Sequence, residues 1–189
     1  MTELKNKKEI LRKQYLSLRE SIPAEKRMEM SLAIAKNLFK TERYNDAATI
    51  ACYYAVRSEV STEEILRHAL SHGKIVYLPR TGERGIELCR IESLEGLAEG
   101  KYGIPEPPKH SVAALPGEVE LFILPAVAVD RAGNRLGYGP GHYDRLLQNT
   151  TAIKAALAFS RQIADAVPQE PHDIAADMIL TEEEVIECR

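Results

Sequence analysis

The residues between Gly133 and Gly141 have the types and spacing to bind a phosphate group. Four of the 11 glycines of the chain lie in this stretch, and glycine lets backbone amides turn toward a bound anion. The stretch leaves an apolar segment and precedes a predicted helix, where free N–H groups and the positive end of the helix dipole meet. Arg135 adds a fixed cation. The pattern is neither GxxxxGK[ST] nor GxGxxG, and a long turn with a β-bulge is the alternative.

Two aspartates could complete such a site by holding magnesium. Asp144 falls in the first turn of the helix predicted after the glycines, and Asp173 follows a proline-bounded loop before the last predicted strand. Magnesium takes one or two carboxylates together with phosphate oxygens and keeps several waters. The alternatives are that Asp144 only complements the helix dipole and that Asp173 only forms a turn.

Lys8 and Arg12 are four positions apart in a predicted N-terminal helix, so they share one helix face. Residues 1–45 contain 11 Lys and Arg but 6 Asp and Glu, whereas the whole chain has a net charge of −3. A basic segment on an acidic body indicates a local anion site, and both side chains could reach one polyphosphate. A solvated basic helix face would give the same pattern.

Further candidates follow the strand predicted at 49–54. Glu59 would lie at the sheet edge where ligands bind, and Tyr54 offers a flat surface for stacking. A solvated carboxylate and a core tyrosine are the simpler interpretations. His68 and His72 are four apart on a predicted helix but lack a third metal ligand, so they are interpreted as polar residues near a helix end. No defensible Ser/His/Asp set is found.

Helices and strands alternate along the chain, which predicts one α/β domain over residues 1–189 with a mainly parallel sheet flanked by helices. In such a sheet, ligands bind beyond the carboxyl ends of the strands. A capping box of Ser61 and Glu64 opens one helix, which Gly73 ends, and residues 92–117 are predicted as loop. The remaining helices are expected around 4–19, from Pro23 and at 142–148, and strands at 49–54, 74–78 (stopped by Pro79), 85–91, 121–125 (continued by 126–130), 153–159 and 177–180.

With Arg135-Leu136-Gly137-Tyr138-Gly139 leading to Tyr143-Asp144-Arg145, the sequence resembles the 5-formyltetrahydrofolate cyclo-ligase family. The ordered set covers nearly the whole chain at family length, and the glycine stretch is its most specific part. The other matching motifs are Lys8-Glu9-Ile10-Leu11-Arg12, Glu59 before Thr62-Glu63-Glu64-Ile65, Leu78-Pro79-Arg80, Tyr102-Gly103-Ile104-Pro105-Glu106-Pro107, Ala158-Phe159, and Val167-Pro168 through His172-Asp173.

The resemblance implies a ligase that uses ATP and Mg²⁺ to convert 5-formyltetrahydrofolate, with or without a polyglutamate tail, into 5,10-methenyltetrahydrofolate, ADP and phosphate. It also implies a fold similar to phosphosugar isomerases and coenzyme A transferases. Phosphorylation of the formyl oxygen would be followed by attack of N10, with Arg135 and Lys8 neutralising the transferring phosphoryl group. No protein nucleophile is needed.

The resemblance also implies residue roles. Asp144 and Asp173 would hold the metal. Folate would contact Tyr54, Glu59, Tyr138, Gly139, Pro140, Gly141 and His142. ATP would contact Lys8, Glu9, Ile10, Leu11, Arg12, Arg135, Leu136, Gly137, Tyr138, Gly139, Pro140, Gly141, His142 and Tyr143.

The chain departs from the family pattern at two of these positions. Pro140 stands where glycine or lysine is more usual, and its nitrogen donates no hydrogen bond. His142 stands where tyrosine is common, and it introduces a group that titrates near neutrality. These departures bear on the affinity for ATP more than on the class of reaction.

Composition limits the other possibilities. The chain has 189 residues, 28% of them charged, three scattered cysteines and no apolar run long enough to span a membrane. We expect a cytoplasmic protein, a monomer or weak dimer, without nucleic-acid or membrane partners. Two alternatives remain open: a non-catalytic folate- or nucleotide-binding protein, and a phosphosugar isomerase-like enzyme with Glu59 as its general base.

Overall fold

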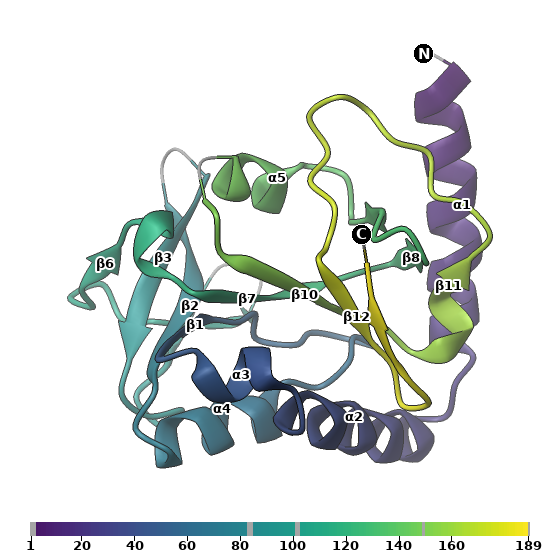
Figure 1. The fold of residues 1–189 in the computed structure, drawn as a ribbon. Coiled ribbons are helices and arrows are strands. Elements are labelled where there is room, and N and C mark those ends of the chain that lie inside the picture. Colours follow the sequence, from purple (N-terminus) through teal and green to yellow (C-terminus); the bar gives the residue numbers. More distant parts are fainter. Residues whose placement is uncertain (1–2, 83–84, 101–102, 149, 189) are drawn as a thin grey trace.

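The computed structural model describes residues 3–82, 85–100, 103–148 and 150–188, so Tyr102 of the motif set lies outside the described residues. Its centre is an eight-stranded sheet (Figure 1). The strands lie in the order β13 (Val185–Glu187), β12 (Met178–Leu180), β10 (Ile153–Leu157), β7 (Leu121–Pro125), β1 (Thr49–Ala51), β2 (Ile75–Gly82), β3 (Gly85–Ile91) and β6 (Ala113–Ala114).

The middle of the sheet is parallel. Strands β12, β10, β7, β1 and β2 pair in parallel, whereas β13 at one edge and β3 and β6 at the other pair antiparallel. In β7 the four residues from Leu121 to Leu124 are all buried, because helices cover both faces of a parallel sheet. The expected α/β fold with a mainly parallel sheet is confirmed.

Helices cover the two faces unequally (Figure 1). The helices α2 (Ala24–Phe39), α3 (Glu42–Asp46) and α4 (Glu63–Ser71) lie on one face, where Ile34, Leu38, Ile65 and Leu66 are fully buried against the strands. The short helix α5 (His142–Leu147) lies on the other face, with Leu147 in a smaller core. The helix α1 (Glu3–Glu20) runs along one end of the sheet. None of the helices described is long and apolar enough to cross a membrane.

Residues 126–130 were expected to continue the strand at 121–125, but part of this segment belongs to a second, small sheet. Strand β8 (Ala128–Asp130) pairs with β9 (Arg135–Leu136) and β11 (Ile163–Ala164), so 126–130 does not extend β7. The chain turns out of the main sheet at Ala126 and Val127. Their carbonyl groups accept hydrogen bonds from the buried Gln162 side chain, at 2.9 and 2.8 Å. This break places β9 and the glycine stretch beside α1.

Two local expectations were wrong. Strand β2 continues through Pro79 to Gly82, because β1 pairs only with Ile75–Tyr77 and no bond from that side needs the missing N–H of Pro79. No capping box opens α4. Thr62 precedes the helix, and its hydroxyl donates to the carbonyl of Tyr53 at 2.7 Å, while the amide of Ser61 donates to Ser31 at 3.0 Å. Gly73, at φ +74°, follows the helix as expected.

Other differences are shorter or additional elements. Strands β1 and β10 end earlier than predicted, at Ala51 and Leu157, and β13 was not predicted. The segment 92–117, expected as loop, holds short strands. The strands are β4 (Ala98–Glu99), β5 (Pro105–Glu106) and β6, and a 3₁₀ turn, η2 (Pro116–Glu118), begins at the end of the segment. A further 3₁₀ turn, η3 (Ser160–Gln162), lies outside it.

Candidate active site

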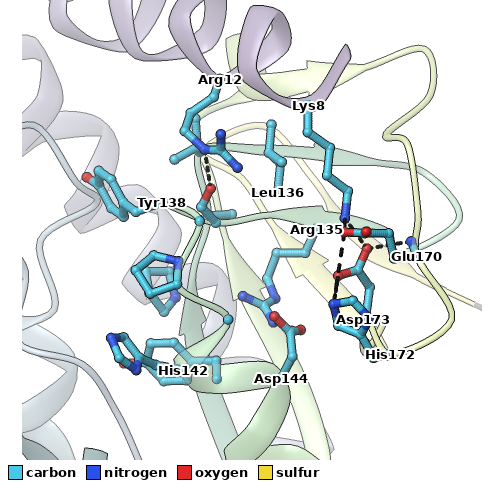
Figure 2. A pocket seen from close by; sticks show the side chains of 18 of the residues that line it. Lys8, Arg12, Arg135, Leu136, Tyr138, His142, Asp144, Glu170, His172 and Asp173 are labelled. Atoms are coloured by element: carbon cyan, nitrogen blue, oxygen red, sulfur yellow. Dashed lines mark hydrogen bonds and ion pairs between the residues drawn. The ribbon is translucent and has the colours of Figure 1, made fainter. Parts of the chain in front are cut away.

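A cavity of about 460 Å³ lies beyond the carboxyl end of β7, where Pro125 ends the strand. Helix α1, the glycine stretch, the β2–β3 hairpin and the loop before β12 contribute its walls (Figure 2). This is the edge at which parallel sheets bind ligands. The predicted residues that line the cavity are Lys8, Glu9, Arg12, Arg135, Leu136, Gly137, Tyr138, Gly139, Pro140, Gly141, His142, Tyr143, Asp144 and Asp173.

Four predicted residues do not line the cavity. Ile10 is exposed on α1, and Leu11 packs against the core that contains Leu136. Tyr54 packs against the larger hydrophobic core, and Glu59 accepts a hydrogen bond from the backbone N–H of Val56 at 2.9 Å. Lining residues that were not predicted are Lys5, Pro79, Ile86, Pro125, Ala126, Val127, Glu170 and His172.

The glycine stretch brings backbone close to a cation from α1. Gly139 and Gly141 have φ values of +122° and +65°, which side-chain-bearing residues rarely adopt. Nε of Arg12 donates to the carbonyl of Gly137 at 2.9 Å, and its guanidinium lies over Gly139, 3.7 Å from where a Cβ would be. The following helix α5 has six residues, so the loop amides and side-chain cations contribute more to anion binding than its dipole does.

Arg135 is the most buried cation of the cavity. Its side chain is 3% exposed, and one terminal nitrogen donates to Oδ1 of Asp144 at 2.9 Å. Its Nε has no hydrogen-bond partner among the described residues. Burial lowers the pKa of Arg135, although Asp144 opposes that shift. A buried donor without a partner is costly, and an anionic oxygen entering the cavity would supply one.

Lys8 ties α1 to the loop before β12 (Figure 2). Its ammonium group lies 2.5 Å from Oδ2 of Asp173 and 2.9 Å from a carboxylate oxygen of Glu170. Burial of Lys8 lowers its pKa, but these two carboxylates outweigh burial and hold the pKa above its ordinary value. Burial of Asp173 likewise opposes ionisation, yet Lys8 keeps its pKa low. The cluster is therefore charged throughout the neutral range.

Glu170, His172 and Asp173 are also close enough to hold a metal ion together. Asp144 is not part of this group, although both expected metal ligands line the cavity. Among the described residues, no donor is bonded to Oδ1 of Asp173 or Oδ2 of Asp144. Each aspartate therefore keeps one oxygen for a hard cation, which matches the one or two carboxylates that magnesium takes beside a phosphate.

The two positions at which the chain departs from the family pattern share one contact. Arg145 donates to the carbonyl of Pro140 at 2.8 Å and lies 2.9 Å from Nδ1 of His142. Burial, together with the charge of Arg145, lowers the pKa of His142. His142 is therefore neutral at pH 7, and Arg145 fixes the loop from outside the cavity.

Sequence reasoning missed Arg19, which is buried at one end of the site. Arg19 follows Lys8 and Arg12 by eleven and seven positions, so all three lie on one face of α1. That spacing could have found it. For Glu170 we find no comparable signal, because its approach to Lys8 depends on how β12 is placed in the sheet.

Comparison with known proteins agrees with this geometry. Residues 4–182 match the model of the 5-formyltetrahydrofolate cyclo-ligase family. This chain belongs to that family. The 5-formyltetrahydrofolate cyclo-ligase of Mus musculus is 30% identical over 177 residues, 86% of this chain and 87% of the mouse protein. The enzyme of the same name from Mycolicibacterium smegmatis is 37% identical over 141 residues, 70% of this chain and 73% of the relative.

A solved structure supports the same cyclo-ligase assignment. The NMR structure of Aquifex aeolicus 5,10-methenyltetrahydrofolate synthetase superimposes with a TM-score of 0.87 at 32% identity, covering 96% of this chain and 93% of the other. The expected family, ligase class and role in folate one-carbon metabolism are therefore confirmed, which decides against the binding-only and isomerase alternatives. The expected likeness to phosphosugar isomerases and coenzyme A transferases stays a prediction.

Proposed function

We propose that this chain uses ATP to close 5-formyltetrahydrofolate into 5,10-methenyltetrahydrofolate, releasing ADP and phosphate. The observation that carries the proposal is the buried guanidinium of Arg135, beside the glycine stretch and Arg12. Its Nε has no hydrogen-bond partner in the part of the chain that the structure describes. This arrangement suits a polyphosphate, because loop amides and fixed cations can surround several anionic oxygens.

The first step transfers the γ-phosphoryl group. The formyl oxygen attacks the γ-phosphorus, the bond from that phosphorus to the β–γ bridging oxygen breaks, and ADP leaves. We assign to Arg135 the contact with the transferring group, because its buried side chain lines the cavity, and Lys8 lines the same cavity from α1. Catalysis of such a step is mainly positioning and charge neutralisation, so the chain needs no nucleophile of its own.

The second step closes the ring. N10 of the folate attacks the formyl carbon, which now carries a phosphate leaving group, and the carbon–oxygen bond breaks as phosphate departs. N10 gives up its proton to complete the product. The cations that bound the phosphoryl group also stabilise the departing phosphate, which is the general electrostatic principle of such sites.

Asp144 and Asp173 are the residues that would hold Mg²⁺, since each has one carboxylate oxygen that accepts no hydrogen bond from the described residues. Glu170 lies close to Asp173. When bound, the ion neutralises phosphate charge and orients the transferring group. Lys8 already contacts the other oxygen of Asp173, so the carboxylate can serve both cations at different atoms.

The folate end of the site is proposed to lie at Tyr138. Figure 2 shows its side chain on the opposite side of the cavity from Lys8 and Asp173. Burial raises the pKa of Glu59, whereas the backbone N–H of Val56, the charge of Arg19 and the Tyr138 hydroxyl oppose that shift. Tyr54 and Glu59 remain proposed folate contacts, although neither lines the cavity. To contact them, the folate would have to extend beyond the cavity lining, or the lining residues would have to move.

The test is formation of the methenyl product, followed by near-ultraviolet absorbance. Purified protein is mixed with 5-formyltetrahydrofolate, ATP and Mg²⁺, and each component is omitted in turn. Absorbance that requires all three supports the proposal. The matched control pair is Arg135→Met, expected to lose at least about a hundredfold in turnover, against Arg131→Met at an exposed ion pair with Glu184, expected to match the unaltered protein.

The assembly and location of the protein also remain proposals. We propose that residues 1–189 act as one domain in a monomer or weak dimer in the cytoplasm, without nucleic-acid or membrane partners. The net charge of −3 argues against a nucleic-acid coat. Light scattering at micromolar and at millimolar protein would measure the mass, and a dimer that persists at both concentrations would contradict a monomer or weak dimer.

A further inference from the structure

Arg19 is a charged side chain buried as deeply as the hydrophobic core. It is 1% exposed, and among the described residues no carboxylate lies within ion-pair distance of it. Burying a cation without a direct counter-charge is costly, so its hydrogen bonds must compensate. The reaction proposed above does not use it.

The hydrogen bonds of Arg19 join three separate elements of the site. Nε donates to Oγ of Ser58 at 3.0 Å, in the loop after β1. One terminal nitrogen donates to the carbonyl of Ala126 at 3.4 Å, where the chain leaves β7. The other donates to the hydroxyl of Tyr138 at 2.5 Å, in the glycine stretch. One helix residue thus fixes the loop, the strand end and the glycine stretch relative to one another.

The side chain of Tyr138 contacts the protein interior through its hydroxyl and lines the cavity. Its residue surface is 40% exposed, yet its hydroxyl is held by the buried Arg19. The guanidinium carbon of Arg19 also lies 5.6 Å from the centre of the Tyr138 ring. The ring is therefore held at one end, with its remaining surface available to a ligand in the cavity that it lines.

Glu59 completes this arrangement. Burial raises its pKa, while the backbone N–H of Val56, the charge of Arg19 and the Tyr138 hydroxyl all lower it. A tyrosine oxygen that accepts from Arg19 keeps its own proton free to donate to a carboxylate. The charge of Arg19 and the Tyr138 hydroxyl thus favour the ionised form of Glu59, whose carboxylate accepts a hydrogen bond from the backbone N–H of Val56.

We infer that Arg19 is a positioning residue for the folate substrate: it holds the hydroxyl of Tyr138 and thereby fixes the aromatic ring as one wall of the folate end. This inference rests on the proposed function. It assigns no contact between Arg19 and substrate, because Arg19 is buried beneath Tyr138.

The experiment is a double-mutant cycle with Tyr138→Phe, Arg19→Met and both together, read as KM and kcat for each substrate. Tyr138→Phe keeps the ring and removes only the hydroxyl. We expect each single variant to raise KM for 5-formyltetrahydrofolate about tenfold, with KM for ATP and kcat within about twofold. The double variant should be no worse than the worse single variant, because both changes remove one interaction.

Two further variants separate positioning from folding. Arg19→Lys keeps the charge but can reach fewer of the three acceptors, so KM for folate should lie between those of the unaltered protein and Arg19→Met. If Arg19→Met does not fold, Arg19→Lys replaces it in the cycle. Arg131→Met is the control at an exposed arginine and should match the unaltered protein.

Three results would overturn the inference. The first is an unchanged KM for 5-formyltetrahydrofolate in Arg19→Met, or in Arg19→Lys where that variant replaces it. The second is a double variant whose increase in KM equals the product of the increases in the two single variants. The third is a loss of kcat with KM for 5-formyltetrahydrofolate unchanged. If the unaltered protein forms no methenyl product, the proposed function fails. Calorimetric titration with 5-formyltetrahydrofolate then compares the same variants with the unaltered protein by their dissociation constants for folate. Absence of folate binding in the unaltered protein would overturn both.

Discussion

Lys8 and Asp173 form an ion pair in the lining of the cavity, with Nζ 2.5 Å from Oδ2, although 165 positions separate them in the chain. The pair joins α1 to the loop before β12 and closes one end of the cavity. A protein cation therefore already lies beside the carboxylate that the family resemblance assigns to magnesium. Lys8 contacts Oδ2 of Asp173, whereas the proposed magnesium contact falls on Oδ1.

Replacing Lys8 with Met should lower stability in a pH-dependent way. In the folded chain the pKa of Asp173 lies below its ordinary value of 3.8 and that of Lys8 above 10.5. The pair therefore stabilises the fold above the ordinary carboxyl pKa, and this contribution is lost as pH falls through the folded pKa of Asp173. It is lost again as pH rises through the folded pKa of Lys8.

Urea unfolding of both proteins across pH measures the effect. The difference in unfolding free energy should be about 1 kcal/mol between pH 5 and 9, because Lys8 and Asp173 are partly exposed and water weakens their attraction. The difference should shrink below pH 4. Lys7→Met is the control, since Lys7 pairs with Glu3 at an exposed position. A difference that is constant down to pH 2 would show that the lost stability is not electrostatic.

Arg12→Ala should raise KM for ATP about tenfold and KM for 5-formyltetrahydrofolate less. Arg12 holds the carbonyl of Gly137 and covers Gly139, so its loss removes a cation and loosens the glycine stretch. Steady-state kinetics with each substrate varied measure the two constants. Lys13→Ala is the neighbouring control at an exposed position. An effect confined to folate would reverse the placement of α1 at the phosphate end.

Asp144→Asn should abolish most magnesium-dependent turnover and also cost stability. Asp144 is the counter-charge of Arg135, whose side chain is 3% exposed, so the change affects the fold as well as the site. Asparagine can still accept from the amide of Ile174, yet the buried guanidinium loses its charge partner. We expect about 1–3 kcal/mol less unfolding free energy, with the chain still folded at 25 °C.

Product absorbance and urea unfolding of the same preparation test both parts. Asp165→Asn, at an exposed aspartate outside the cavity, is the control and should change neither quantity. Undiminished turnover would remove Asp144 from the mechanism. Unchanged stability would mean that the Arg135–Asp144 pair contributes nothing net to the fold.

His142 should titrate below its ordinary pKa of 6.5, because burial and the charge of Arg145 both disfavour the imidazolium. Proton NMR of the histidine ring protons, assigned with His142→Gln, measures this value. Arg145→Ala should raise it, since removing a neighbouring cation favours protonation. The resonance of His110 provides the control and should not move. A His142 pKa above 6.5 in the unaltered protein would contradict the contact with Arg145.

The parts of the site that the sequence predicts are those built locally. One stretch of a dozen positions contains the glycines, Arg135 and Asp144. The residue types in it indicate a loop, a cation and the start of a helix. The apolar run of β7 likewise predicts a strand buried on both faces. Because these features depend on spacing along the chain, the sequence predicted the buried strand and the helix start that the structure confirms. The binding roles of Arg135 and Asp144 stay predictions.

The parts that were missed depend on contacts between distant segments. Glu170 meets Lys8 only because α1 lies along the end of the sheet near β12, and the turn from β7 into β8 depends on Gln162. Neither relationship has a local sequence pattern. Arg19 differs, since its helical phase matches Lys8 and Arg12, but the sequence does not show that Ser58 and Tyr138 cover it.

Gly133→Ala should be strongly destabilising for a reason unrelated to phosphate binding. Gly133 turns the chain from β8 into β9 at φ +91°, and its carbonyl accepts from the amide of Ala176 at 2.8 Å. A Cβ at this position would lie 2.3 Å from the carbonyl oxygen of Ala176 and 3.0 Å from Cβ of Cys188. Backbone strain and overlap together should cost about 3 kcal/mol of unfolding free energy.

Gly117→Ala is the matched control, because its φ is not positive and no heavy atom of the described residues, its chain neighbours aside, lies within 4 Å of its Cβ position. That change should leave unfolding free energy within about 1 kcal/mol of the unaltered protein or raise it. Urea unfolding compares the three proteins. Since β9 carries Arg135, folded Gly133→Ala protein should also show a raised KM for ATP. Equal stabilities of the two variants would mean that the β8–β9 turn can shift away from Ala176 at little cost.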